Sequence, residues 1–330
     1  MIDTGVPRVV GIVGAGAIGV GWAVVFARGG CDVRVFEPDA VRREALAGEV
    51  SSRLRRLLTA GLLDEDPDAV CARVSSVGSL AECIRAADYV QECGPELLEF
   101  KQRILSEIDE RAPEGCPVGS SSSAIPCSSM ASDLHGRARF LVVHPGNPPY
   151  LIPVAELVPA PFTAEAVVEW VRQFLVDMGM TPVVLASEPE GFVFNRIQGA
   201  VLREAYCLVR DGVITPSDLD RVVRDGLARR WAVVGPFATA DLNVPGGLEA
   251  HAARMGASYA RMGAERGQDD PWTADLVRKV AQDIHESMPL SRWEESVQRR
   301  DDALMHMERA RRTCPRVVDD QTDWSTTARP

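Results

Sequence analysis

The stretch RVVGIVGAGAIGVGWAVVFARGGCDVRVFE, residues 8–37, contains the clearest structural pattern of the sequence. It opens with a β-branched run that ends in glycines, and an apolar segment of helical character follows. Gly29 and Gly30 stop that segment, after which a second run alternates between polar and apolar residues and ends at Glu37. A strand, a glycine-rich turn, a helix and a second strand make a βαβ unit, so the stretch predicts a parallel sheet.

The alternation of strand and helix continues to about residue 188. Three further strands are expected, at DYVQEC (residues 88–93), PVGSSSS (residues 117–123) and RFLVVH (residues 139–144). From Pro189 onward nearly every segment has a helical pattern. We therefore predict an α/β fold: a Rossmann-type doubly wound parallel sheet in residues 1–188, followed by an all-α C-terminal domain for substrate binding and dimerisation in residues 189–330.

The turn after the first strand carries a glycine pattern. Gly14, Gly16 and Gly19 fit G-x-G-x-x-G between a strand and a helix, the arrangement that binds the pyrophosphate of a dinucleotide at a helix N-terminus. Glu37 would accept hydrogen bonds from the adenosine ribose and repel a 2′-phosphate, so NAD is expected rather than NADP. The residues expected to contact the cofactor are Gly14, Gly16, Ala17, Ile18, Gly19 and Glu37.

Two alternatives for this cofactor site stay open. Arg42 and Arg43 follow closely and are able to accommodate a 2′-phosphate, although we favour a solvated helix face for both. A flavin would use the same glycine motif, which does not distinguish it from NAD.

Composition narrows the class of protein. The 330 residues carry a net charge of −11, which argues against binding to nucleic acid or to an anionic membrane surface. The eight cysteines are scattered without a CxxC pair, and the sequence shows no metal-binding pattern. The apolar run from Gly11 to Ala27 is short for a membrane span and contains five glycines. We expect a cytoplasmic protein that acts on a small molecule, with no metal, nucleic-acid or membrane partner.

A histidine and a glutamate share the segment VVHPGNPPYLIPVAELVP, residues 142–159. His144 ends a predicted strand, at the sheet edge where doubly wound folds bind ligands. Glu156 follows within an otherwise apolar run. Glu156 could lie on the solvent side of a strand. The more specific interpretation is that its carboxylate orients the imidazole of His144. The pair predicts a general base, in which Glu156 fixes the tautomer of His144 and stabilises the imidazolium that forms.

Seven segments together resemble the 3-hydroxyacyl-CoA dehydrogenase superfamily, and most closely its lambda-crystallin or L-gulonate 3-dehydrogenase branch. In order along residues 8 to about 245 they are IVGAGAIG, QECGPE, SSSS, HPGNPPYLIPVAELVP, EGFVFNR, PSDLD and GPFATADLN. The resemblance implies catalytic roles for His144 and Glu156. It adds Ser123 and Asn195 as residues that hydrogen-bond the reacting oxygen.

The implied reaction is the oxidation of a secondary alcohol, in which His144 takes the hydroxyl proton while a hydride passes to NAD. Glu96 and Lys101 match the family's residues near the nicotinamide ribose. Lys101 is notable because the chain has only two lysines against 34 arginines. A lysine kept against that bias suggests a role that a planar guanidinium cannot fill.

The choice of substrate depends on fewer residues. Arg230, in DGLARRWAVVGP, is expected to pair with the carboxylate of a small, L-gulonate-like 3-hydroxy acid, and Arg229 is the competing assignment. Basic residues of the segment SSRLRRLL could instead hold the phosphates of a CoA substrate, although a solvated helix face is the simpler interpretation. These residues are Arg53, Arg55 and Arg56.

Several alternatives stay open. Gly146 and the segment SSSSAIP depart from the gulonate-type pattern, so other β-hydroxy acids and a CoA or carrier-bound hydroxyacyl substrate are possible. A protein of another class is a further alternative, either a crystallin-like structural protein or a binding protein for NAD. Neither of these needs the pair of His144 and Glu156. We expect a homodimer, because an apolar helix is predicted over residues 192–209 and the helical second domain of this superfamily typically pairs with a second copy.

Overall fold

The computed structural model describes residues 9–245, 247–266, 275, 278 and 289–313. These residues form two compact units. The first holds the described residues up to Ile197 together with Asp301–Arg309, and the second holds Gln198–Arg300 and the described residues from Ala310 onward. The division expected between residues 188 and 189 stays a prediction about which parts of the chain fold independently.

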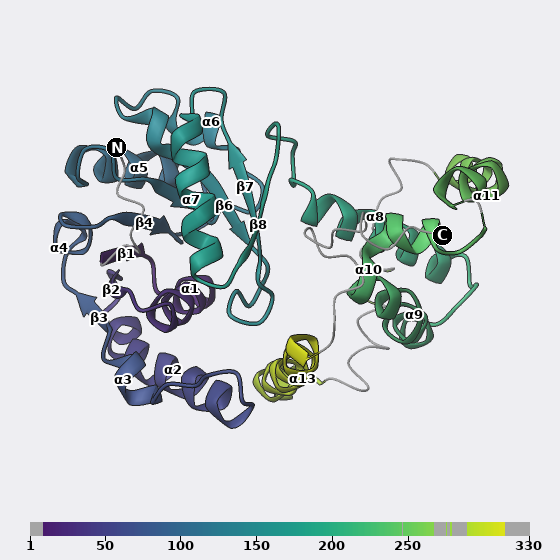
Figure 1. Cartoon of the computed structure of the whole chain (residues 1–330), viewed down its shortest axis with the longest axis horizontal. Coiled ribbons are helices and arrows are strands. Elements are labelled where there is room, and N and C mark those ends of the chain that lie inside the picture. The colour runs from purple at the N-terminus through teal and green to yellow at the C-terminus, as the bar shows by residue number, and fades with distance from the viewer. Residues whose placement is uncertain (1–8, 246, 267–274, 276–277, 279–288, 314–330) are drawn as a thin grey trace, which may run out of the picture. The chain divides into compact units, whose positions relative to one another are not determined.

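The first unit is built on one eight-stranded sheet (Figure 1). Its strands are β1 Val9–Val13, β2 Asp32–Phe36, β3 Val74–Val77, β4 Tyr89–Glu92, β5 Val118–Ser120, β6 Phe140–Pro145, β7 Val154–Pro159 and β8 Thr181–Val184. They lie in the order β3-β2-β1-β4-β5-β6-β7-β8, and all neighbours are parallel except β6 and β7. The chain runs outward from β1 in both directions, so the predicted doubly wound sheet is confirmed.

Helices cover both faces of this sheet. They are α1 Ala17–Arg28, α2 Ala40–Thr59, α3 Pro67–Cys71, α4 Leu80–Ile84, α5 Leu98–Arg111, α6 Cys127–Ala131 and α7 Glu165–Asp177, with a 3-10 turn at Arg137–Arg139. One core cluster joins residues of α1, α2 and α7 to Ile12 and Val143, and another joins α4, α5 and α6 to Val13 and Val142. Successive side chains of a strand point to opposite faces, so the two clusters lie on opposite sides of the sheet.

The burial of α1 explains why its sequence is so apolar. Every residue from Gly19 to Ala27 is buried. Trp22 stacks on Phe26 with 5.2 Å between the ring centroids. A helix that is apolar on all sides suits the core of an α/β sheet. Within the described ranges, no helix is long and apolar enough to cross a membrane.

The second unit is helical, as predicted for the C-terminal part of the chain. Its helices are α9 Pro216–Val222, α10 Ala228–Asp241 and α11 Gly247–Ala264, with a π-helical turn at Val223–Leu227 and a 3-10 turn at Leu290–Arg292. The side chain of Thr215 caps α9 by accepting a hydrogen bond from the backbone N–H of Asp218. Two helices belong to both units, α8 Phe194–Arg210 and α13 Trp293–Thr313.

The sheet brings distant parts of the sequence to one edge. The turns that carry Gly14, Glu37, Cys93 and Ser121 follow β1, β2, β4 and β5, and His144 lies at the end of β6. Because these five strands are parallel, their carboxyl ends meet at the same edge of the sheet. The fold therefore gathers the predicted cofactor and catalytic segments on that edge.

Candidate active site

The glycine-rich turn is shaped for a close approach of another group to its backbone. Gly14 has φ +108°, and a side chain there would also meet the carbonyl oxygen of Cys93. A side chain at Gly19 would overlap the carbonyl oxygen of Gly14. In contrast, a methyl group on Gly16 would meet nothing within 4 Å. Gly16 is also the residue before α1, whose first backbone N–H groups lack partners within the helix, so the turn fits a pyrophosphate.

Glu37 is tied to this turn. Its Oε2 accepts a hydrogen bond of 2.9 Å from the backbone N–H of Ala15, and its Oε1 accepts one of 3.0 Å from Asp39. Arg42 donates to the carbonyl oxygen of Ala15, and Arg43 donates to that of Glu37. The two arginines are therefore not the solvated helix face that we favoured, because both guanidinium groups brace the backbone of the expected cofactor site.

The structure brings His144 and Glu156 together. The two residues are paired across the antiparallel strands β6 and β7, with 2.8 Å between His144 Nδ1 and Glu156 Oε2. Glu156 is buried, with 4% of its surface exposed, so the solvent-facing alternative for this residue is wrong. A carboxylate oxygen accepts hydrogen bonds, so this contact suits the imidazole tautomer that has its proton on Nδ1 and leaves Nε2 for another partner.

A backbone turn that the sequence did not predict completes the setting of Glu156. Its Oε1 accepts hydrogen bonds of 2.8 Å and 3.0 Å from the backbone N–H groups of Val193 and Phe194. The preceding Phe192 has φ +52°, a conformation that non-glycine residues rarely adopt. This strained turn aims two N–H groups at one oxygen, so Glu156 is held on both sides. No residue type marks such a turn in a sequence.

Ser123 and Asn195 also meet. The amide Nδ2 of Asn195 donates to the carbonyl oxygen of Ser123 over 3.0 Å, although the two residues lie 72 positions apart. Ser123 is exposed in the turn after β5, and Asn195 lies in the first turn of α8. The resemblance therefore paired two residues that are neighbours in this fold.

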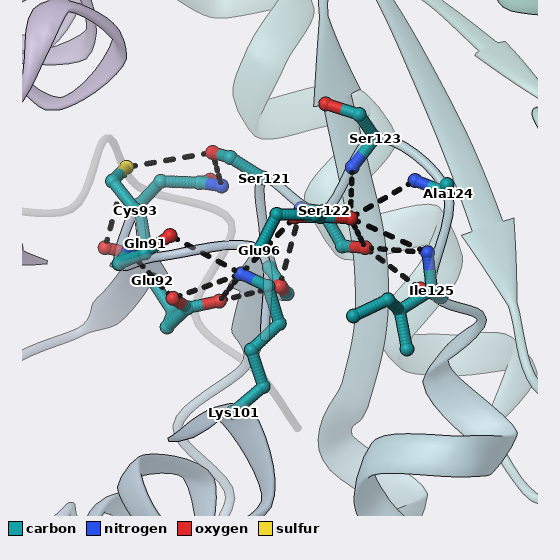
Figure 2. Close-up of polar contacts among 12 residues, drawn as sticks. Gln91, Glu92, Cys93, Glu96, Lys101, Ser121, Ser122, Ser123, Ala124 and Ile125 are labelled. Atoms are coloured by element: carbon teal, nitrogen blue, oxygen red, sulfur yellow. Dashed lines mark hydrogen bonds and ion pairs between the residues drawn. The ribbon is translucent and has the colours of Figure 1, made fainter. Parts of the chain in front are cut away.

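Glu96 and Lys101 belong to a network of charged and polar groups at the ends of β4 and β5. Figure 2 shows the ammonium group of Lys101 pointing to the carboxylate of Glu92, at 2.9 Å and 3.1 Å from its two oxygens. Glu96 points the other way, to the turn of Ser122–Ile125. Both residues lie at the expected edge of the sheet, but Lys101 is buried, with 1% of its surface exposed.

The arginines considered for substrate binding differ in their hydrogen bonds and ion pairs. Arg230 lies in the second unit, where it is exposed and donates a long hydrogen bond of 3.4 Å to Asn243. Arg229 lies 3.7 Å from Asp225. The three arginines considered for CoA are held in ion pairs on the first unit, Arg53 with Glu49, Arg55 with Asp68 and Arg56 with Asp302. Among the described residues, no cluster of His, Cys, Asp and Glu is suited to a metal ion.

Two family models match the chain. Residues 9–188 match the model described as 3-hydroxyacyl-CoA dehydrogenase, NAD binding domain, and residues 191–283 match the 3-hydroxyacyl-CoA dehydrogenase C-terminal domain. The first match covers the sheet, the glycine-rich turn, and both His144 and Glu156. The cofactor expected from the glycine motif is therefore NAD, which removes the flavin alternative.

Individual proteins are similar over nearly the whole length. A 3-hydroxyacyl-CoA dehydrogenase of Gibberella moniliformis is 35% identical over 91% of this chain and 94% of its own. A lambda-crystallin homolog of Rattus norvegicus is 34% identical over 90% and 94%. Among solved structures, 5-formyl-3-hydroxy-2-methylpyridine 4-carboxylic acid 5-dehydrogenase, an NAD+-dependent dismutase, has a TM-score of 0.77 at 26% identity and covers 92% of this chain and 98% of that one.

Proposed function

The chain belongs to the 3-hydroxyacyl-CoA dehydrogenase family, and from this premise we propose that it oxidises the 3-hydroxyl group of a small, L-gulonate-like 3-hydroxy acid to the 3-keto acid with NAD. The observation that carries the proposal is the buried contact of 2.8 Å between His144 and Glu156 at the carboxyl edge of the sheet. A base oriented in this way suits the removal of a hydroxyl proton.

His144 is the proposed general base. With the proton of Nδ1 donated to Glu156, Nε2 presents its lone pair to the substrate hydroxyl. As Nε2 takes the proton, the imidazole becomes an imidazolium ion beside the Glu156 carboxylate, which stabilises it. Glu156 itself is held by the N–H groups of Val193 and Phe194, so the imidazole plane does not need to reorganise during the transfer.

Ser123 and Asn195 are proposed to hydrogen-bond the reacting oxygen. The amide of Asn195 has two N–H groups, and one of them is used to hold the carbonyl oxygen of Ser123. The second N–H and the Ser123 hydroxyl would then meet the oxygen as charge develops on it. When bound, NAD supplies the hydride acceptor, and the turn of Gly14–Gly19 with Glu37 is proposed to hold it.

The contacts of the candidate arginines favour a free acid over a thioester. The arginines that could meet CoA phosphates are paired with Glu49, Asp68 and Asp302, whereas the contact of Arg230 among the described residues is a long hydrogen bond to a neutral amide. The solved relative also carries the name of a small carboxylic acid as its substrate. The family name and the fungal relative favour the alternative, a 3-hydroxyacyl-CoA or carrier-bound hydroxyacyl substrate. The similarity to a lambda-crystallin homolog supports a different kind of alternative, in which this chain is a structural protein without catalytic activity.

The test is the formation of NADH, followed by absorbance, with free 3-hydroxy acids (L-gulonate, L-carnitine and 3-hydroxybutyrate) beside 3-hydroxybutyryl-CoA. We expect turnover of a free acid that falls by about 10³-fold or more in His144→Ala. His135→Ala, at an exposed histidine, is the control and should retain activity. In the same assay Arg230→Met should raise KM for the acid, because a carboxylate clamp is lost.

The substrates that are turned over in the NADH assay distinguish the alternatives. Turnover of the thioester alone would keep the mechanism but overturn the carboxylate clamp of Arg230. An effect on KM in Arg229→Met instead would transfer that role by one residue. Silence with both substrate sets would favour the non-catalytic alternative. We also propose the cytoplasm as the compartment, because the seven described cysteines are all unbonded, as a reducing compartment would keep them.

A further inference from the structure

The C-terminal half of α2 lies against the segment Asp301–Arg309 of α13, which belongs to the first unit. Arg56 of α2 forms an ion pair of 2.7 Å with Asp302. Met305, with 2% of its surface exposed, is buried in the same core cluster as Leu57 of α2. Because a partly exposed ion pair contributes little by itself, the burial of Met305 is what holds this segment on α2.

The same segment reaches the loop that follows His144. Tyr150 of that loop donates a hydrogen bond of 3.1 Å to Asp301, and both side chains are buried. Arg53 of α2 acts on the same hydroxyl group, since burial and Asp301 raise the pKa of Tyr150 and Arg53 opposes the rise. Arginines of α2 and carboxylates of α13 therefore lie together beside the loop of the proposed base.

The position of these arginines bears on the class of substrate. The family that the chain matches is named for CoA thioesters, and the phosphates of CoA are bound by arginine or lysine side chains. A chain with a net charge of −11 does not attract a polyanion as a whole, so it would need cations close to the site. Arg53 and Arg56 lie next to the loop, whereas Arg55 turns to α3 and pairs with Asp68.

We propose that the segment Asp301–Arg309 is a specificity element, which keeps the phosphates of a CoA thioester away from Arg53 and Arg56 and so favours a free hydroxy acid. Asp302 takes the position that a phosphate would need at Arg56, and Asp301 brings a second carboxylate to the loop. This inference deepens the proposed function and rests on its choice of a free acid. The segment lies beyond residue 283, where the match to the family's C-terminal domain ends.

The first experiment removes the carboxylate from the ion pair of Arg56. Asp302→Asn is compared with Asp68→Asn, which removes the partner of Arg55 from an ion pair of similar length. Calorimetric titration with CoA gives Kd, and the NADH assay gives KM for 3-hydroxybutyryl-CoA. In Asp302→Asn we expect both constants to fall by about tenfold, because a phosphate can then meet the guanidinium group. In Asp68→Asn both should stay within about twofold of the parent, and a free acid should be turned over equally by all three proteins.

The second experiment tests whether Arg56 is the group that Asp302 covers. Arg56→Met in the parent should leave the weak binding of CoA nearly unchanged, because Asp302 already occupies the guanidinium group. The same substitution in Asp302→Asn should remove the tighter binding. The tighter binding should also shrink in about 0.5 M salt, since salt screens the attraction between a phosphate and an exposed cation.

Three results would overturn the inference. The parent could bind CoA as tightly as Asp302→Asn, the two could bind it equally weakly, or Asp68→Asn could gain as much, which would assign the effect to net charge or to Arg55. The proposed function fails on a different result. A parent that turns over no free acid contradicts that choice of substrate, whereas tighter binding of CoA in Asp302→Asn alone would still show that α13 covers a phosphate-binding face of α2.

Discussion

At the scale of single residues, the glycine-rich turn separates two kinds of glycine. A side chain at Gly19 overlaps the carbonyl oxygen of Gly14, whereas one at Gly16 meets no protein atom within 4 Å. We predict that Gly16→Ala keeps its thermal stability but binds NADH about tenfold more weakly, because the methyl group would occupy the approach of the pyrophosphate. Gly19→Ala should lower Tm instead, since the overlap lies within the protein itself.

Fluorescence titration with NADH and thermal unfolding of the two variants make the comparison. Gly48→Ala, at another glycine whose added methyl group meets nothing within 4 Å, is the matched control within α2 and should bind NADH normally. If Gly16→Ala bound NADH as tightly as the parent, the pyrophosphate would have to lie elsewhere, and the open space beside Gly16 would have no role in cofactor binding.

Residue types alone predict some of the contacts in the candidate site. A carboxylate within an apolar run, such as Glu156, is conspicuous, and the structure pairs it with His144. The partners of Glu156 and Glu96 on the backbone were invisible, because any residue can supply an N–H group. The bracing of the cofactor turn by Arg42 was misjudged for a related reason: a helical position does not reveal that a long side chain reaches back to a preceding loop.

At the scale of elements, α13 holds the loop that follows His144. Tyr150, at the end of that loop, donates a hydrogen bond of 3.1 Å to Asp301 of α13, and both side chains are buried. Met305, one turn farther along α13, is buried in the same core cluster. The loop also packs on α1, since a side chain at Gly21 would meet the ring of Pro149. The loop that follows His144 is thus fixed by a residue that lies 151 positions after Tyr150 in the sequence.

This contact predicts a pH-dependent stability. Burial raises the pKa of Tyr150 to about 12, Asp301 adds to the rise and Arg53 opposes it. An unfolded tyrosine titrates near pH 10, so the contribution of Tyr150 to stability is complete below about pH 10 and is lost as the pH rises toward 12. In that window the free energy of unfolding should fall by up to about 1.4 kcal/mol per pH unit more in the parent than in Tyr150→Phe.

Urea unfolding of both proteins between pH 8 and about pH 11 measures this difference. Tyr259→Phe, at a tyrosine with 54% of its surface exposed, should follow the parent at every pH. Equal pH slopes for the parent and Tyr150→Phe would mean that the Tyr150 hydroxyl titrates normally, and that the contact with α13 does not hold the loop.

The sheet could be predicted only in part at this scale. The strands β1, β2, β4, β5 and β6 have β-branched or alternating patterns bounded by turns, and all were expected. The antiparallel pairing of β6 with β7 and the addition of β8 at the edge were not. A four-residue strand such as β8, Thr181–Val184, offers too short a pattern to mark its partner, which depends on packing across the whole sheet.

At the scale of the whole molecule, the alternation of strands and helices followed by helices alone was sufficient to predict two units. The return of Asp301–Arg309 to the first unit was not foreseeable, because the apolar pattern of α13 is compatible with packing on either unit. Sequence patterns report local periodicity, whereas such a long-range contact is selected by the surface that the sheet and its helices leave available.

The exposed apolar side chains of the second unit favour a homodimer. In α10, Gly235 with φ +73° and Pro236 kink the helix, and Phe237 follows with 78% of its surface exposed. Other large apolar side chains of this unit are exposed as well, among them Leu242, Tyr259 and Met262. Exposed apolar surface of this kind is typical of a contact between protein chains.

We therefore expect light scattering after gel filtration to give twice the mass of one chain at micromolar concentration. Phe237→Asp should raise the dissociation constant by about 100-fold or more, because it places an anion where an apolar contact is proposed. Val176→Asp, an equally drastic change at an exposed valine of α7 in the first unit, should leave the dimer intact. A monomeric parent would contradict the dimer itself, whereas a dimer indifferent to Phe237→Asp would place the contact on a face that does not include α10.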